Sequence, residues 1–271
     1  MTILFSIILG IIQGLTEFLP ISSSGHLVIF HDIFNWQTAD NLSYDVFLHW
    51  GTLLALILFF YKDIIRYLSA FLQSLKKWDL KNNLDQKVAW LIILSMIPAS
   101  LIGFYWEDLI NSLFRNLFSV AIFLIIVGLL FLIVEKVSKK QLNFQSLSWQ
   151  KSLILGLAQS VALLPGVSRS GATISTGLAL NLNREAAARF SFLMSIPIVF
   201  AAGVKKAWDL KNLALSSQEI LIYFLGFLAA MVIGYLTIKF LLEYLKNHTL
   251  NIFAYYRIIL GILVLIYFVI K

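Results

Sequence analysis

Long apolar runs separated by short polar segments make up most of this chain. A membrane-spanning helix needs about 20 predominantly apolar residues to cross the hydrocarbon core of a bilayer. Runs of this kind predict transmembrane helices, in which every backbone polar group is satisfied within the segment itself. The predicted spans are residues 45–61, 88–106, 117–134, 189–204, 220–242 and 252–270.

Two further apolar regions, residues 2–34 and 152–182, are each broken midway by proline, glycine and serine. Each half is too short to cross the membrane alone. Irregular backbone at membrane depth is tolerated only where protein or a water-filled cavity satisfies it, so we expect two re-entrant hairpins. The fold predicted for residues 1–271 is a single all-α polytopic membrane domain with two re-entrant helical hairpins and about six full transmembrane helices.

The two broken regions also match each other in sequence at a constant spacing of 146 positions: Gly10, Gln13, Ser22, Ser24 and Gly25 correspond to Gly156, Gln159, Ser168, Ser170 and Gly171. This indicates an internal repeat. The first copy covers about residues 1–136 and the second about 150–271, each with one hairpin and three spans. An odd number of spans per copy predicts an inverted-topology repeat, whose broken helices meet near the membrane midplane.

Composition agrees with a membrane protein, since 60% of the 271 residues are hydrophobic and 13% are charged. The formal net charge of +7 does not predict a nucleic-acid partner here, because the Lys and Arg residues gather mainly in loops on one predicted side, as the positive-inside rule requires. The loop with Lys205, Lys206 and Lys211 is the exception. The charged run from Lys62 to Lys87 is expected to be a solvated cytoplasmic loop.

Both termini are then expected on the outer side. No basic region precedes the first apolar run, so we expect no cleaved signal peptide. The chain has no cysteine, which excludes disulfides, thiolate metal sites and cysteine nucleophiles.

Candidate chemistry begins in the first hairpin with Gln13 and Glu17. They are four residues apart and share one face of a helix, which Pro20 ends soon afterwards. A carboxylate near the middle of a membrane helix costs about 2.5 to 3.5 kcal/mol on insertion scales, so Glu17 is expected to have a function.

A polar turn follows in each hairpin and leads into a second short helix, whose first backbone N–H groups have no partner of their own and suit an anion. In the first hairpin this helix starts near His26. In the second, Arg169 takes the place of Ser23, and a guanidinium can bind phosphate oxygens through two parallel hydrogen bonds. The candidate ligand-binding residues are Gln13, Ser22, Ser24, Gly25, Ser168, Ser170 and Gly171.

Two helix N-termini, one arginine and several hydroxyls suit a polyanion such as a diphosphate. Glu17, His26 and Ser23 supply acid–base and nucleophilic groups that could split it. For the remaining serines, helix capping is as strong an interpretation as ligand binding. His49, next to Trp50 in an apolar span, is interpreted as a packing histidine.

The segments TEFLPISSSGH (residues 16–26) and PGVSRSGATIS (residues 165–175) together resemble the undecaprenyl-diphosphate phosphatase family, also called bacitracin-resistance proteins, and the resemblance extends over essentially the whole chain. It implies a bacterial inner-membrane hydrolase that converts undecaprenyl diphosphate to undecaprenyl phosphate and inorganic phosphate for peptidoglycan synthesis. It also implies bacitracin resistance, a site facing the periplasm and dependence on Mg²⁺ or Ca²⁺, and it leaves a homodimer open.

By position, the resemblance assigns catalytic roles to Glu17, Ser23, His26 and Arg169. Many family members have Glu where this chain has Gln13, so a metal ion would find only one carboxylate, Glu17. The carbonyl oxygen of Gln13 can still coordinate a metal, and Mg²⁺ often relies on substrate phosphates and water. The attacking group is open between Ser23, a phosphoimidazole at His26, and water.

Two other functions are compatible with parts of the pattern. A transporter or flippase of a polyprenyl phosphate would use the inverted repeat, Arg169 and the helix ends, but would need no nucleophile. An intramembrane serine protease would use Ser and His together, but it leaves Arg169 without a role.

Overall fold

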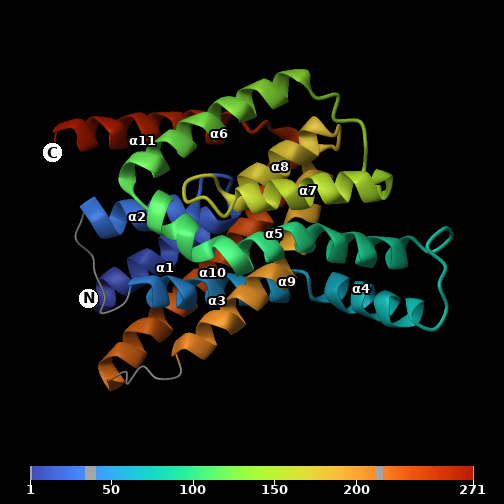
Figure 1. Ribbon diagram of the computed structural model, residues 1–271, viewed down its shortest axis with the longest axis horizontal. Coiled ribbons are helices and arrows are strands. Elements are labelled where there is room, and N and C mark those ends of the chain that lie inside the picture. Colours follow the sequence, from blue (N-terminus) through green and yellow to red (C-terminus); the bar gives the residue numbers. More distant parts are fainter. Residues whose placement is uncertain (1, 34–40, 211–215, 271) are drawn as a thin grey trace.

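The computed structural model describes residues 2–33, 41–210 and 216–270, without the side chains of 41–43 and 206–210. These residues form helices and contain no β-strand apart from one isolated bridge (Figure 1). The helices are α1 (Ile3–Phe18), α2 (Ser23–Ile33), α3 (Asn41–Phe59), α4 (Tyr61–Ser74), α5 (Leu84–Phe114), α6 (Leu117–Val137), α7 (Trp149–Val161), α8 (Arg169–Ala179), α9 (Arg184–Leu210), α10 (Ser217–Asn247) and α11 (Asn251–Ile270), with a short 3₁₀ turn at Phe144–Ser146.

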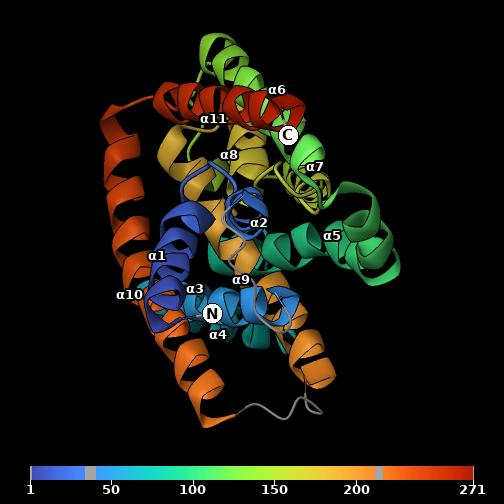
Figure 2. The same cartoon turned by 90° about the vertical axis from the view of Figure 1, so that its left-hand side faces the viewer.

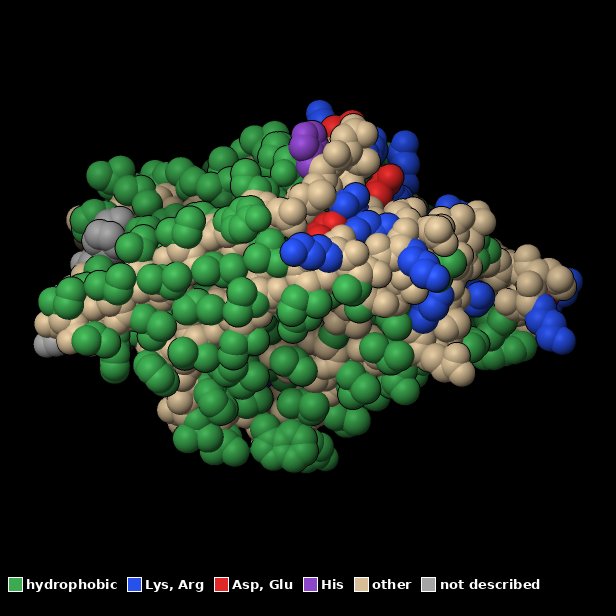
Figure 3. Space-filling model, turned by 90° about the horizontal axis from the view of Figure 1, so that it is seen from above, with side chains coloured by type: hydrophobic (Ala, Val, Ile, Leu, Met, Phe, Trp, Pro, Cys, Tyr) green, Lys and Arg blue, Asp and Glu red, His purple; other side chains and the backbone are tan. Residues whose placement is uncertain are grey.

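Five of these helices, α5, α6, α9, α10 and α11, are long and apolar enough to cross a membrane. The pair α3 and α4 is bent by 78° and raises the number to 6 when it is counted as one span. The prediction of an all-helical, multi-pass membrane protein with about six spans is therefore confirmed. The space-filling view shows hydrophobic side chains over most of the visible surface (Figure 3).

The expectation of a solvated loop from Lys62 to Lys87 holds only for residues 75–83, because the first half of the stretch forms α4 and its last four residues begin α5. The number of charges in this stretch obscured its helical period. Apolar residues recur every three or four positions, and one face of the helix is buried. Charged groups on α4 also have partners, since Asp63 pairs with Arg189 at 2.7 Å. In the predicted loop with Lys205, Lys206 and Lys211, Lys205 instead lies on α9 and pairs with Glu107. Lys211 and the side chain of Lys206 lie outside the described residues. The same holds for Phe34, at the end of the first predicted hairpin.

The two broken helices approach the centre of the molecule from opposite ends. In Figure 1, α1 and α2 occupy the left-hand half, α7 begins in the right-hand half, and the two connecting turns lie between them. Figure 2 shows α10 running beside α1 and α6 lying along α11. Both termini lie at the left-hand end, whereas the Lys and Arg side chains visible in Figure 3 gather towards the other end.

Small residues let α1 lie directly against α10, as the G-x-x-x-G spacing of Gly10 and Gly14 predicts. A Cβ added at Gly10 would lie 2.3 Å from the carbonyl oxygen of Gly226, and one at Gly14 would lie 2.8 Å from the backbone nitrogen of Gly234. Because α1 carries Gln13 and Glu17, this close packing also sets where those two side chains point.

Replacing Gly10 by Ala should therefore separate α1 from α10 and lower the stability by about 1–3 kcal/mol, the usual cost of overpacking. The matched control is Gly103→Ala on α5, where the nearest atom to an added Cβ is 3.8 Å away. Thermal unfolding in detergent checks the pair: Gly10→Ala should lower Tm, and Gly103→Ala should leave it unchanged or slightly raised. Equal Tm values for both variants would contradict the close contact.

Candidate active site

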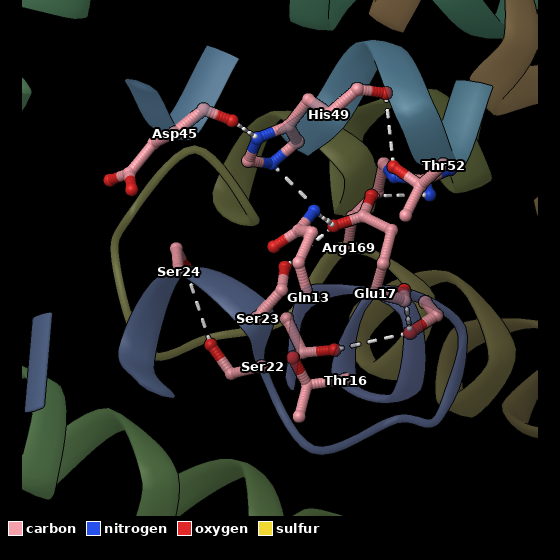
Figure 4. A network of polar contacts seen from close by, with 12 residues as sticks. Gln13, Thr16, Glu17, Ser22, Ser23, Ser24, Asp45, His49, Thr52 and Arg169 are labelled. Carbon is pink, nitrogen blue, oxygen red and sulfur yellow. Dashed lines mark hydrogen bonds and ion pairs between the residues drawn. The ribbon is translucent and has the colours of Figure 1, made fainter. Parts of the chain in front are cut away.

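The carboxylate of Glu17 is the centre of a buried polar cluster near the end of α1. One oxygen, Oε1, accepts a hydrogen bond from Nη2 of Arg169 at 3.0 Å. The other, Oε2, accepts from Oγ of Ser23 at 2.6 Å and from Nε2 of Gln13 at 3.1 Å. Figure 4 shows these side chains converging from α1, α2 and α8. Three of the four residues predicted to be catalytic thus meet at one carboxylate.

The two turns that lead into α2 and α8 have the same local geometry. Ser22 and Ser168 both adopt left-handed backbone, with φ of 76° and 74°. Each hydroxyl accepts a hydrogen bond from the backbone N–H three residues later, Gly25 at 3.2 Å and Gly171 at 3.1 Å. Both serines therefore cap the helix that follows. Their hydroxyls already have these partners, and their contact with a ligand stays a prediction.

The two turns also touch each other and α1. The backbone N–H of Gly166 donates to Oγ of Ser24 at 3.5 Å. Ser170 Oγ donates to the backbone carbonyls of Glu17 and Leu19 at 3.4 Å and 3.3 Å. Ser24 and Ser170 thus join elements that are far apart in the sequence, which brings Ser23 and Arg169 to the same place.

His26, the fourth predicted catalytic residue, has other partners than Glu17. Its Nδ1 lies 2.7 Å from the backbone carbonyl of Ser22 and its Nε2 lies 2.7 Å from the hydroxyl of Tyr256 on α11. The ring is buried and stacks on that tyrosine. A tyrosine within an apolar run carries no signal of such a contact, so sequence reasoning missed Tyr256.

His49 is not the packing residue that the sequence suggested. Its Nδ1 bonds to the backbone carbonyl of Asp45 at 2.7 Å, and its Nε2 lies 3.6 Å from Oε2 of Glu17. One third of its side chain (33%) is exposed, and it faces the cluster from α3 (Figure 4). The signal that could have found it is an ionisable side chain inside a span, which by default marks a functional site.

A cavity of about 220 Å³ reaches this histidine from between α2, α3, α5 and α9. Ser24 and His49 line it, and Glu107 and Arg115 contribute charge to its wall. It reaches Glu17 through His49, which contacts that carboxylate. Arg115 is held by Asp45 at 2.5 Å. The cavity can lead a charged headgroup towards the cluster.

Two buried polar atoms beside Glu17 lack a hydrogen-bond partner: Oε1 of Gln13 and Nη1 of Arg169. The described residues contain no group of three or more His, Cys, Asp or Glu that could hold a metal ion. An unpartnered carbonyl oxygen next to one carboxylate nevertheless fits a hard cation whose other ligands are phosphate oxygens and water. The unpartnered guanidinium nitrogen fits a phosphate oxygen.

Comparison with known proteins gives one consistent result. Residues 6–263 match the family model described as bacitracin resistance protein BacA. A protein of Rubrobacter xylanophilus named undecaprenyl-diphosphatase is 43% identical over 263 residues, which cover 97% of each chain. A protein of the same name from Methanosphaera stadtmanae is 42% identical, over 97% of each chain. Another from Corynebacterium striatum is 44% identical, over 96% of this chain and 92% of the relative. The chain therefore belongs to the BacA bacitracin-resistance family.

Proposed function

We propose that this protein hydrolyses undecaprenyl diphosphate to undecaprenyl phosphate and inorganic phosphate. The observation that carries the proposal is the carboxylate of Glu17, which holds the guanidinium of Arg169 through one oxygen and the hydroxyl of Ser23 through the other. One carboxylate thus places an anion-binding group beside a hydroxyl that it can deprotonate, as phosphoryl transfer requires. The shared name of the relatives specifies the substrate.

In the reaction, Nη1 of Arg169 and the first N–H groups of α2 and α8 bind the oxygens of the terminal phosphate. Ser23 Oγ attacks the terminal phosphorus while its proton passes to Glu17. The bond from this phosphorus to the bridging oxygen breaks, and undecaprenyl phosphate leaves. Undecaprenyl phosphate carries away the proton that Glu17 took. Water then attacks the phosphoserine, its proton passes through Glu17 to Ser23 Oγ as the bond from this oxygen to phosphorus breaks, and inorganic phosphate leaves. The alternative is direct attack by a water that Glu17 activates.

The short hydrogen bond from Ser23 to Glu17 supports the serine version over a phosphoimidazole at His26. Both ring nitrogens of His26 are engaged, by Ser22 and by Tyr256. Attack by His26 would require its ring to leave the tyrosine. We assign His26 instead to holding the start of α2, and with it Ser23, in place.

Mg²⁺ or Ca²⁺ is part of the proposal through the unpartnered oxygen of Gln13. Glu17 and Gln13 would hold the ion together with phosphate oxygens and water. When bound, it neutralises charge on the diphosphate.

We further propose an inverted-topology repeat with two re-entrant hairpins, divided at about residues 136 and 150. It is supported by the matching backbone of Ser22 and Ser168 and by the approach of α1 and α7 from opposite ends (Figure 1). Termini that lie away from the cationic end (Figures 1 and 3) support a bacterial inner-membrane protein whose site opens to the periplasm. In this setting the enzyme recycles carrier lipid for peptidoglycan synthesis and confers bacitracin resistance. The polyprenyl tail needs only the apolar surface between helices and lipid.

Phosphate release by purified protein in detergent tests the proposal, because no transport can occur there. Wild type should release phosphate from undecaprenyl diphosphate, and Arg169→Ala should lower the rate about 10²- to 10³-fold, the usual effect of removing a donor to developing negative charge. Arg66→Gln, which removes an exposed arginine paired with Asp85, is the control and should match wild type. A folded wild type that releases no phosphate would favour the transporter or flippase.

A further inference from the structure

Arg257, in the middle of α11, is a completely buried cation, with 0% of its surface exposed. Among the described residues, no carboxylate forms an ion pair with it. Its guanidinium carbon lies instead 5.5 Å from the centre of the Phe131 ring. A charge this deep in a membrane protein is costly and by default indicates a function, and the cluster around Glu17 does not include it.

Within the part of the chain that the structure describes, the guanidinium donates hydrogen bonds only to backbone carbonyls, and the shorter of these bonds reach both hairpin turns. Nη1 donates to Pro20 in the first turn at 3.1 Å. Nη2 donates to Gly166 and Val167 in the second turn at 2.7 Å and 3.0 Å. Longer contacts of 3.4 Å reach the carbonyls of α6 at residues 123 and 124. The planar guanidinium of Arg257 thus supplies hydrogen bonds to turn carbonyls that lie outside any helix and so have no backbone partner there.

These carbonyls stand close in sequence to the reacting groups. Pro20 precedes Ser23 by three residues, and Val167 precedes Arg169 by two. Ser23 and Arg169 meet at Glu17, so the separation of the two turns sets the separation of the attacking hydroxyl from the phosphate-binding guanidinium. We propose that Arg257 is a positioning residue for catalysis, which locks the two turns in register without touching the substrate; this inference rests on the proposed function.

The planar shape of the Arg257 guanidinium, and not its charge alone, is what holds the two turns together. Arginine presents five donors in a rigid plane, whereas lysine presents one ammonium that cannot bridge both turns in the same way. Arg257→Lys and Arg257→Gln should therefore both lower kcat, by about 10²-fold if the reacting groups shift by about 1 Å. KM should stay within about threefold of wild type, because Arg257 does not contact the substrate.

Arg184→Gln is the matched control, since it removes an arginine that forms a two-point ion pair with Glu135 far from the turns. It should lower Tm but leave kcat unchanged. Three results would overturn the proposal: kcat near wild type in both Arg257 variants, a raised KM at unchanged kcat, or an equal fall of kcat in Arg184→Gln. If the Arg257 variants do not fold, Phe131→Leu serves instead, because it removes the ring against which the guanidinium packs and so lets the guanidinium shift. An unchanged kcat in Phe131→Leu would also overturn the proposal.

A second measurement needs no substrate and so separates this inference from the proposed function. The chain has no native cysteine, and Ser170 Oγ lies 3.3 Å from the Leu19 carbonyl. Leu19→Cys with Ser170→Cys therefore places one thiol beside each turn, and oxidative cross-linking in membranes reports their register. Cross-linking should be efficient with Arg257 and fall severalfold with Arg257→Gln, whether or not phosphate is released. Equal cross-linking in both backgrounds would overturn the positioning role.

Discussion

Replacing Glu17 by Gln should abolish nearly all phosphate release, by about 10³-fold or more, while the protein still inserts and folds. The amide cannot take the proton of Ser23 Oγ, which now lies 2.6 Å from the carboxylate, and general-base catalysis contributes about 10² to 10⁴ in rate. The substitution also leaves Arg169 without its counter-charge. Steady-state phosphate release, with Tm measured on the same preparation, checks both effects.

The control for Glu17→Gln is Glu135→Gln. Glu135 is also a buried carboxylate paired with an arginine, Arg184, at 2.7 Å. Breaking a buried pair costs about 3–5 kcal/mol, so both variants should lose stability. Only Glu17→Gln should lose kcat. A parallel fall of kcat in both would show that stability, and not the chemistry at Glu17, explains the effect.

Replacing Ser23 by Ala should lower kcat by about 10³-fold or more, because it removes the attacking oxygen. Ser23→Ala changes one hydroxyl in the first turn of α2 and leaves the capping hydroxyl of Ser22 in place, so Tm should change little. Ser160→Ala on α7 is the control, since its hydroxyl donates to a carbonyl of its own helix, that of Gly156. It should retain wild-type kcat.

Trapping of a phosphorylated intermediate separates the three attacking groups. Rapid quenching of wild type with labelled substrate, followed by peptide mapping, should place the phosphate on Ser23. Label on His26 would contradict the serine version. Ser23→Ala that retained substantial activity without any trapped intermediate would identify water as the attacking group.

Much of this protein could be predicted from local pattern. The apolar runs give the membrane class and the approximate number of spans, because span length depends only on the thickness of the bilayer. Glu17 and Arg169 could be selected because ionisable groups inside apolar runs are costly, and Ser23 because it lies at the turn position that Arg169 occupies in the second hairpin. The helix α4 was missed because its charges concealed an apolar period that becomes clear once its partners, such as Arg189, are known.

The sequence by itself determined that the chain enters a membrane, where its helices break, and which polar residues stand at the breaks. Entry into the membrane depends on the transfer of residues between water and lipid, and the breaks depend on the backbone preferences of proline, glycine and serine; both are local properties. Only the tertiary structure decided which residues meet. His49 on α3 lies beside Glu17, and His26 forms a hydrogen bond with Tyr256. Arg257 donates hydrogen bonds to both turns. The physical reason is that hydrogen bonds act over about 3 Å, so their partners are set by how helices pack and not by spacing along the chain.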